Sequence, residues 1–193
     1  SNISFAIPRR DYSSTSTFDM YEHNISSSNT TTSGATNLFD STFYFKTSTN
    51  RVYKVLDNFG GTSAIGGSEP SFDGVDTVGN YKCMFMYTIT ASEQQAFMTS
   101  DFMPVSTDST VSAAAVDGAL DTVKIVAAGS DGTDGTHTNI DIHGDGTGGK
   151  VSVTISSGGI TAVNVTTAGT GYTFGTINEA DINTAGGGSL NSS

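Results

Sequence analysis

A glycine-rich loop that occurs twice, forty residues apart, constrains this chain more than any other feature of its sequence. Residues 121–142 align without gaps over residues 161–182, and eight of the 22 aligned pairs are identical. The turn glycines that the two copies share are Gly129, Gly135, Gly169 and Gly175. Because glycine enters left-handed backbone conformations at little cost, we predict structural turns that each join an outgoing strand to a returning one. In the second copy the ring of Tyr172 is expected to lie over the turn, where the first copy has Gly132.

The segment between the two loops, KVSVTISSGGITAVNV, reads as a β-hairpin. Its apolar residues alternate, which places Val151, Val153 and Ile155 on one face of a strand, and Gly158-Gly159 separates the two runs. We therefore predict a glycine-rich antiparallel β-module with a two-fold internal repeat over residues 111–182. Residues 183–193 are expected to form a flexible tail.

The first 110 residues are predicted to form a β-rich domain with a long polar loop and a short helix. The loop SSSNTTTSGATN has too little apolar content to pack, whereas the residues after it are rich in β-branched and aromatic types. The expected elements are a hairpin over 43–45 and 51–56, a strand covered on both faces over 81–89, a helix over 91–98, a strand over 102–105 and a helical turn ending at Gly118. Ser92 is the expected N-cap of the helix, with Gln95 at the capping-box position. The fold class is thus mainly β with one or two short helices (α+β) and antiparallel sheets.

The net charge of the chain excludes some classes of partner. Lys and Arg together number 8 against 19 acidic residues, and the net charge is −11. Such a chain repels the phosphates of nucleic acid and an anionic membrane surface, so neither is an expected partner. No apolar run approaches the length needed to span a bilayer.

No set of residues points to catalysis. Cys83 lies inside an apolar strand, where a thiol is usually inert, and no nucleophile has a base spaced to activate it. Neither glycine loop contains a lysine or opens a helix, as a phosphate-binding loop does. We therefore expect no enzyme activity and no cofactor.

Calcium is the metal that the glycine loops could hold. The carboxylates beside the turn glycines are those of Asp131, Asp134, Asp141 and Asp145. The second copy has Gly171 and Phe174 where the first has Asp131 and Asp134, so the acids do not follow the repeat. Aspartates are also common in turns, where the carboxylate accepts hydrogen bonds from the nearby backbone. This explains the four aspartates without a metal, and no metal is expected.

A pair of arginines near the N-terminus stands out in so acidic a chain. Arg9 and Arg10 follow Pro8 and precede Asp11 and Tyr12. They could form a local salt bridge, or they could dock on an acidic partner, since guanidinium groups bind carboxylates with forked donors. The four residues from 9 to 12 are our predicted partner-binding residues. The acids Asp19, Glu22 and Glu93 are expected to be exposed.

Several segments of the chain resemble segments of a known protein family and follow one another in the same order. FAIPRRDY, STFYFKTSTNRVYKVLDN, GNYKCMFMYTI and DFMPV, followed by a glycine module, are similar to the baseplate wedge subunit of T-even-like contractile-tailed phages, especially its marine cyanophage versions. That family has Tyr-x-Trp where this chain has Tyr81-Lys82-Cys83. The family protein is longer at both ends, so the resemblance implies a fragment.

The resemblance implies a structural role without catalytic residues. The expected partners are other tail baseplate proteins, and the family is dimeric, so a homodimer is possible. The expected location is the virion tail baseplate, assembled in the bacterial host cytoplasm, and a single cysteine suits that reducing compartment. An adhesin or glycan-binding β-module of a virion fibre, which would need an exposed aromatic platform, is the first alternative. A calcium-stabilised β-roll-like protein is the second.

Overall fold

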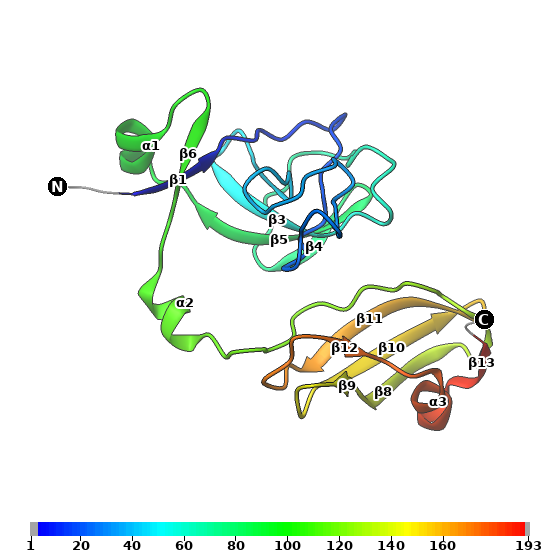
Figure 1. Cartoon of the computed structure of the whole chain (residues 1–193). Coiled ribbons are helices and arrows are strands. Elements are labelled where there is room, and N and C mark those ends of the chain that lie inside the picture. The colour runs from blue at the N-terminus through cyan, green and yellow to red at the C-terminus, as the bar shows by residue number, and fades with distance from the viewer. Residues whose placement is uncertain (1–3, 192–193) are drawn as a thin grey trace. The chain divides into compact units, whose positions relative to one another are not determined.

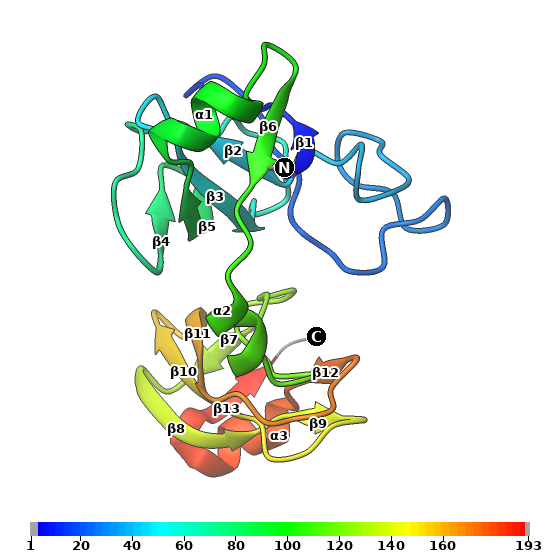
Figure 2. The same cartoon turned by 90° about the vertical axis from the view of Figure 1, so that its left-hand side faces the viewer.

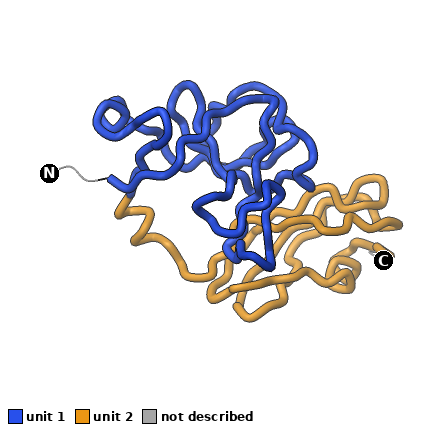
Figure 3. The backbone as a smooth tube through the Cα atoms, turned by 45° about the horizontal axis from the view of Figure 1, so that its top comes forward, with its two compact units in different colours: residues 1–107 blue, residues 108–193 orange. Residues whose placement is uncertain are grey.

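The computed structural model describes residues 4–191 and divides the chain into two compact units, Ser1–Thr107 and Asp108–Ser193, here called unit 1 and unit 2 (Figure 3). Both units are built mainly from antiparallel strands, which confirms the predicted fold class. The described residues form three short α-helices, one more than expected. Within residues 4–191, no helix is both long and apolar enough to cross a lipid bilayer.

Unit 1 contains a four-stranded sheet in the order β2-β3-β5-β4 and a separate pair, β1–β6 (Figures 1 and 2). Its elements are β1 (Phe5–Pro8), β2 (Tyr44–Lys46), β3 (Arg51–Asp57), β4 (Val75–Val78), β5 (Tyr81–Thr88), α1 (Ala91–Phe97) and β6 (Phe102–Val105). The predicted β2–β3 hairpin and the β6 strand are confirmed. Asn50 takes the left-handed conformation in the hairpin turn, with φ of 62°.

Aromatic rings fill the core of unit 1. Phe45 stacks on Tyr53 with ring centroids 5.7 Å apart and meets Phe18 at 5.0 Å. All three are buried, together with Tyr81 from β5. Because each ring removes a large apolar area from water, this cluster holds the sheet and the N-terminal loop together.

Strand β5 is open on part of one face, so the prediction that both of its faces are covered was wrong. Tyr81 and Cys83 are fully buried, whereas Met84 is half-buried and Met86 is 46 % exposed. The physical reason is that the residues of β1 and of the loop before β2 that lie beside Met86 do not fill the space over it. An apolar groove occupies that place.

Asp19 is buried, not exposed as predicted. Its carboxylate accepts hydrogen bonds from the backbone N–H groups of Ser33 and Thr42, both at 2.8 Å, and from the hydroxyls of Ser33 and Ser41. Burial alone raises the pKa of Asp19, but these hydrogen bonds outweigh it, so the pKa lies below its ordinary value. One carboxylate thus fixes a loop whose own side chains are too polar to pack. Glu22 accepts a hydrogen bond from Asn29 and is half-buried.

Helix α1 forms where predicted, but its cap is different. The N-cap is Thr90, and its hydroxyl accepts a hydrogen bond from the N–H of Glu93, while the Glu93 carboxylate accepts from the N–H of Thr90 at 2.9 Å. The capping box is therefore shifted by two residues from the predicted Ser92 and Gln95, because an acid accepts more strongly than an amide. Glu93 is consequently half-buried.

Unit 2 contains the three-stranded sheet β11-β10-β8 and two small strand pairs, β12–β9 and β13–β7. Its elements are α2 (Ser109–Ala114), β7 (Ser130–Gly132), β8 (Gly135–Asp141), β9 (His143–Gly144), β10 (Lys150–Ser156), β11 (Gly159–Thr167), β12 (Gly175–Thr176), α3 (Glu179–Ile182), the π-helical turn η1 (Asn183–Gly187) and β13 (Gly188–Asn191). The predicted β10–β11 hairpin is confirmed, with Val151, Val153 and Ile155 buried on one face. The helical turn that was expected to end at Gly118 starts earlier, because the Asp108 side chain caps α2, and it ends at Ala114, so the predicted end was wrong.

The predicted flexible tail is ordered over residues 183–191. Strand β13 pairs with β7, and the Asn183 side chain accepts from the N–H of Leu190 at 2.9 Å. Leu190 is 2 % exposed and belongs to the core of unit 2. The prediction of a flexible tail was wrong because the core of unit 2 has room for the Leu190 side chain. Burial of this one apolar side chain holds the glycine-rich segment in place. Residues 192–193 lie outside the described part of the chain.

Candidate interaction surface

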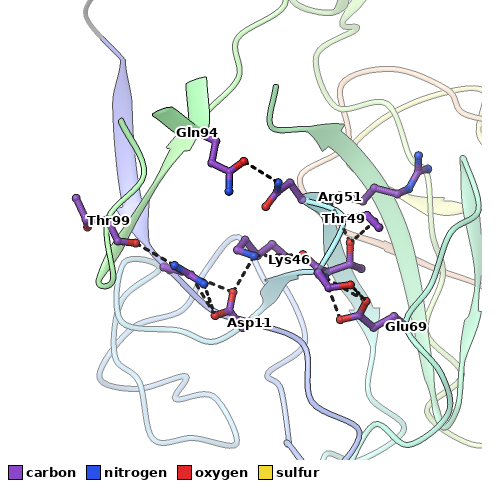
Figure 4. A network of polar contacts seen from close by, with 11 residues as sticks. Asp11, Lys46, Thr49, Arg51, Glu69, Gln94 and Thr99 are labelled. Carbon is purple, nitrogen blue, oxygen red and sulfur yellow. Dashed lines mark hydrogen bonds and ion pairs between the residues drawn. The ribbon is translucent and has the colours of Figure 1, made fainter. Parts of the chain in front are cut away.

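The predicted partner-binding segment is engaged within unit 1. The guanidinium of Arg9 donates to both carboxylate oxygens of Asp11 at 3.1 Å and to the carbonyl of Thr99 at 3.2 Å. The carboxylate of Asp11 also lies 3.0 Å from the buried ammonium of Lys46, as Figure 4 shows. Burial raises the pKa of Asp11, but hydrogen bonds from Arg9 and Lys46 outweigh it, so the pKa is lowered overall.

Arg10 and Tyr12 are held in the same way. Arg10 donates to the carbonyl of Asp40 at 3.0 Å, and its guanidinium carbon lies 5.5 Å from the centre of the Tyr44 ring. The Tyr12 hydroxyl donates to the carbonyl of Gly66 at 2.6 Å. These are the contacts of a local network, so a docking role for residues 9–12 stays a prediction.

A polar cavity of about 410 Å³ lies beside this network. It is lined by both signs of charge, by the cations Arg9 and Lys46 and by the acids Asp11 and Glu69. Glu69 is itself bonded, since it accepts from the N–H and the hydroxyl of Ser48 (Figure 4). The balance of charge leaves no preference for an anion or a cation.

An apolar groove of about 430 Å³ lies elsewhere on unit 1. Strands β1, β2, β3, β5 and β6 and the loop before β2 supply its lining, which includes Ile7, Leu38, Phe39, Phe43, Val52 and Met86. Phe39 is 58 % exposed, although it is surrounded by other apolar side chains. A contiguous apolar surface of this kind marks a binding site more often than a chance exposure.

The two tyrosines that line the groove turn their hydroxyls away from solvent. The hydroxyl of Tyr44 donates to the carbonyl of Pro8 at 2.8 Å, and that of Tyr87 donates to the carbonyl of Pro104 at 3.1 Å. Burial raises the pKa of Tyr87 to about 12. The rings therefore present apolar surface to the groove, and a partner finds little there to hydrogen-bond.

Sequence reasoning missed the groove. The signal was the pair Leu38-Phe39, two large apolar residues at the end of an otherwise polar loop. The loop has no periodicity from which to infer where these side chains point. Only the fold brings them beside Met86, which is 48 residues further along the chain than Leu38.

In unit 2 the two predicted glycine turns share a left-handed residue. Gly129 has φ of 69° and Gly169 has φ of 64°, and Gly135 also lies at positive φ, of 143°. Gly175 does not, and there a side chain would press on Ile142 instead. The flanking strands differ in length, since Gly135 begins β8 and Gly175 the two-residue β12, and the internal repeat stays a prediction.

Different side chains close the two loops. Tyr172 is buried against the second loop, where its hydroxyl accepts from the N–H of Gly149 at 3.1 Å. At the first loop Leu190 takes the corresponding place, with its Cδ1 3.0 Å from where a Cβ on Gly132 would lie. The position of Tyr172 over the turn agrees with the expectation from sequence.

The four aspartates considered for calcium each bond a separate partner. Asp131 accepts from the Ser130 hydroxyl, Asp134 from the N–H of Gly158, Asp141 pairs with Lys150, and Asp145 accepts from the N–H groups of Thr173 and Phe174. Within residues 4–191, no group of three or more His, Cys, Asp or Glu side chains is placed to hold a metal. The hydrogen bonds that Asp145 accepts from Thr173 lower its pKa to about 2.

The single cysteine lies in the core of unit 1. Cys83 is fully buried in β5, and burial raises its pKa to about 12. Because the thiolate is the nucleophile, this thiol is unreactive near neutral pH.

Comparisons with protein-family models, with curated proteins and with solved structures found no match to this chain.

Proposed function

We propose that this chain is a non-catalytic structural subunit of a phage tail baseplate wedge that binds neighbouring proteins of the virion. The likeness of FAIPRRDY, RVYKVLDN and GNYKCMFMYTI to the wedge family supports the assignment to a baseplate. The single observation that carries the binding role is the apolar groove of unit 1. On this proposal the protein works in the virion and is assembled in the cytoplasm of the bacterial host.

The groove suits a protein partner. Its lining mixes aliphatic and aromatic side chains with Met86, a flexible side chain that adapts to the shape of a partner. Aromatic residues and methionine are enriched in the centres of protein interfaces, where burial supplies most of the binding energy. An apolar side chain of a neighbouring subunit is the simplest occupant.

The alternative of a glycan-binding module is less well supported. Such a module needs an exposed aromatic platform, and the tyrosines are the expected members. None of the seven tyrosines, all of which lie in the described part of the chain, is exposed. The calcium-stabilised alternative is disfavoured because each candidate aspartate already bonds a separate group.

The test uses proteins encoded beside this one in its genome. Each is co-expressed with the wild-type chain or with Phe39→Ser, and complexes are measured by size-exclusion chromatography and calorimetry. Loss of a phenyl ring that the partner buries on binding should weaken the complex by about 3 kcal/mol, close to the cost of truncating a core aromatic residue. Phe59→Ser is the matched control, because Phe59 is 64 % exposed and does not line the groove.

Two results would contradict the proposal. One is that no neighbouring gene encodes a tail protein. The other is that a complex forms and Phe39→Ser and Phe59→Ser bind with the same affinity as the wild type. The second result would show that the interface is not at the groove. It would leave the assignment to a baseplate untouched.

A further inference from the structure

Residues 120–128 of unit 2 run antiparallel to β11, and one backbone hydrogen bond at each end holds them, to Ile160 of β11 and to Ala168 just after it. The N–H of Leu120 donates to the carbonyl of Ala168 at 2.9 Å, and the N–H of Ile160 donates to the carbonyl of Ala128 at 2.7 Å. In the described part of the chain, no backbone hydrogen bond joins residues 121–127 to β11. Since β11 is an edge strand of its sheet, part of its edge is left without a backbone partner. The intervening segment can therefore move without breaking a strand ladder.

A cavity of about 340 Å³ lies behind this segment. Its lining is mostly apolar and includes Val123, Ile125, Val153, Val163, Ile177 and Ile182. Val153, Val163 and Ile182 are buried members of the unit 2 core, so the cavity reaches into the core itself. Close-packed cores leave few voids of this size, whereas small-molecule sites are mostly apolar cavities of about 300–1,000 Å³.

One cation lines this cavity. Lys124 is exposed and makes no hydrogen bond or ion pair with the residues that the structure describes. Unit 2 contains no arginine and one other lysine, Lys150, whose ammonium is paired with Asp141 at 2.5 Å. An ammonium without a partner beside an apolar cavity offers a carboxylate a charge-assisted hydrogen bond.

We propose that the cavity binds a small carboxylate with an apolar tail, such as a medium-chain fatty acid. The tail fills the space between the β10–β11 face and α3, and the carboxylate meets Lys124. Residues 121–127 form the wall that moves to admit the ligand. The inference rests on unit 2 alone and stands or falls independently of the proposed function.

The experiment titrates the full chain with decanoate and with decanol, each below its aggregation concentration. Wild type, Lys124→Gln and the matched control Lys150→Gln are compared by calorimetry and by methyl NMR shifts of Ile177 and Ile182. Decanoate should bind the wild type and Lys150→Gln alike. Lys124→Gln should weaken decanoate about tenfold, as expected for one lost charge-assisted hydrogen bond, and leave decanol unchanged.

Three results would overturn the proposal. Decanoate could fail to bind the wild type. It could shift only resonances of the unit 1 groove, such as those of Met86, which would place the ligand elsewhere. Lys124→Gln and Lys150→Gln could weaken decanoate equally, which would reduce the effect to net charge.

Discussion

The hydroxyl of Tyr172 accepts a hydrogen bond from the backbone N–H of Gly149 at 3.1 Å and donates one to the carbonyl of Ile142 at 3.2 Å. The ring occupies space that glycine leaves open, since a methyl group on Gly146 or Gly169 would overlap it. One side chain thereby ties three backbone segments together.

Tyr172→Phe should destabilise unit 2 by about 1–3 kcal/mol, because a buried N–H and a buried carbonyl lose their partner while the ring stays in place. Scanning calorimetry measures the change. Tyr21→Phe is the control, since no residue from 4 to 191 hydrogen-bonds the Tyr21 hydroxyl and its ring is likewise packed against other side chains. Equal stability of the two variants would mean that the Tyr172 hydroxyl contributes nothing.

Gly169→Ala should cost more than Gly171→Ala. Both residues are left-handed, with φ of 64° and 72°, so both variants bear the conformational cost of about 1–2 kcal/mol. A Cβ on Gly169 would also lie 2.6 Å from the backbone of Gly149 and of Thr147, whereas one on Gly171 meets nothing within 4 Å. Urea unfolding measures both variants. If they lose the same stability, the close packing at Gly169 is unimportant.

Asp145 should make the stability of unit 2 depend on pH in the acidic range. Its pKa falls from 3.8 to about 2 on folding, so its stabilising contribution is complete above the unfolded value and is lost as pH falls toward 2. The difference in unfolding midpoint between wild type and Asp145→Asn should therefore shrink over that interval. A difference that stays constant down to pH 2 would contradict the assignment.

Asp19→Asn should loosen the loop between β1 and β2. The amide presents donors where Ser33 and Thr42 also donate, so hydrogen bonds are lost and about 1–3 kcal/mol of unit 1 stability with them. Limited proteolysis should cut the variant within residues 22–40 faster than the wild type. Asp101→Asn serves as the control, because that exposed carboxylate bonds only the neighbouring hydroxyl of Ser100. Equal cleavage rates would refute the anchoring role.

Asp11→Ala should destabilise unit 1 more than Arg9→Ala. Loss of Asp11 leaves the buried ammonium of Lys46 without its carboxylate, whereas loss of Arg9 leaves the Asp11–Lys46 pair in place. The difference should be about 1–3 kcal/mol by calorimetry, since an unpaired buried charge costs more than a lost surface pair. The reverse order would show that Arg9 is the principal partner of Asp11.

Features that depend on local pattern could be predicted from sequence. The β10–β11 hairpin follows from alternating valines, and α1 from a run of helix formers. Gly129 and Gly169 are predictable turn residues because each follows an alanine and precedes a Gly-Thr pair at the same spacing.

Features that depend on distant partners could not be predicted. Asp19 is buried because Ser33 and Thr42 reach it, and nothing near Asp19 in the sequence signals that. The groove around Phe39 and Met86 exists because the fold brings β1, β5 and the loop before β2 together around it. The residues that line the groove have no regular spacing in the sequence, so no sequence pattern indicates that they lie together.

The pairing of β13 with β7 has a consequence for the order in which unit 2 folds. Gly188 pairs with Gly132, so the chain must close a loop of more than fifty residues before Leu190 reaches the core. The β10–β11 hairpin needs only a two-residue turn, so we expect it to form early and β13 to dock last. A ribosome-bound chain that has not yet exposed Leu190 would carry an open first loop. The core of unit 2 can then be completed only after β13 has been synthesised.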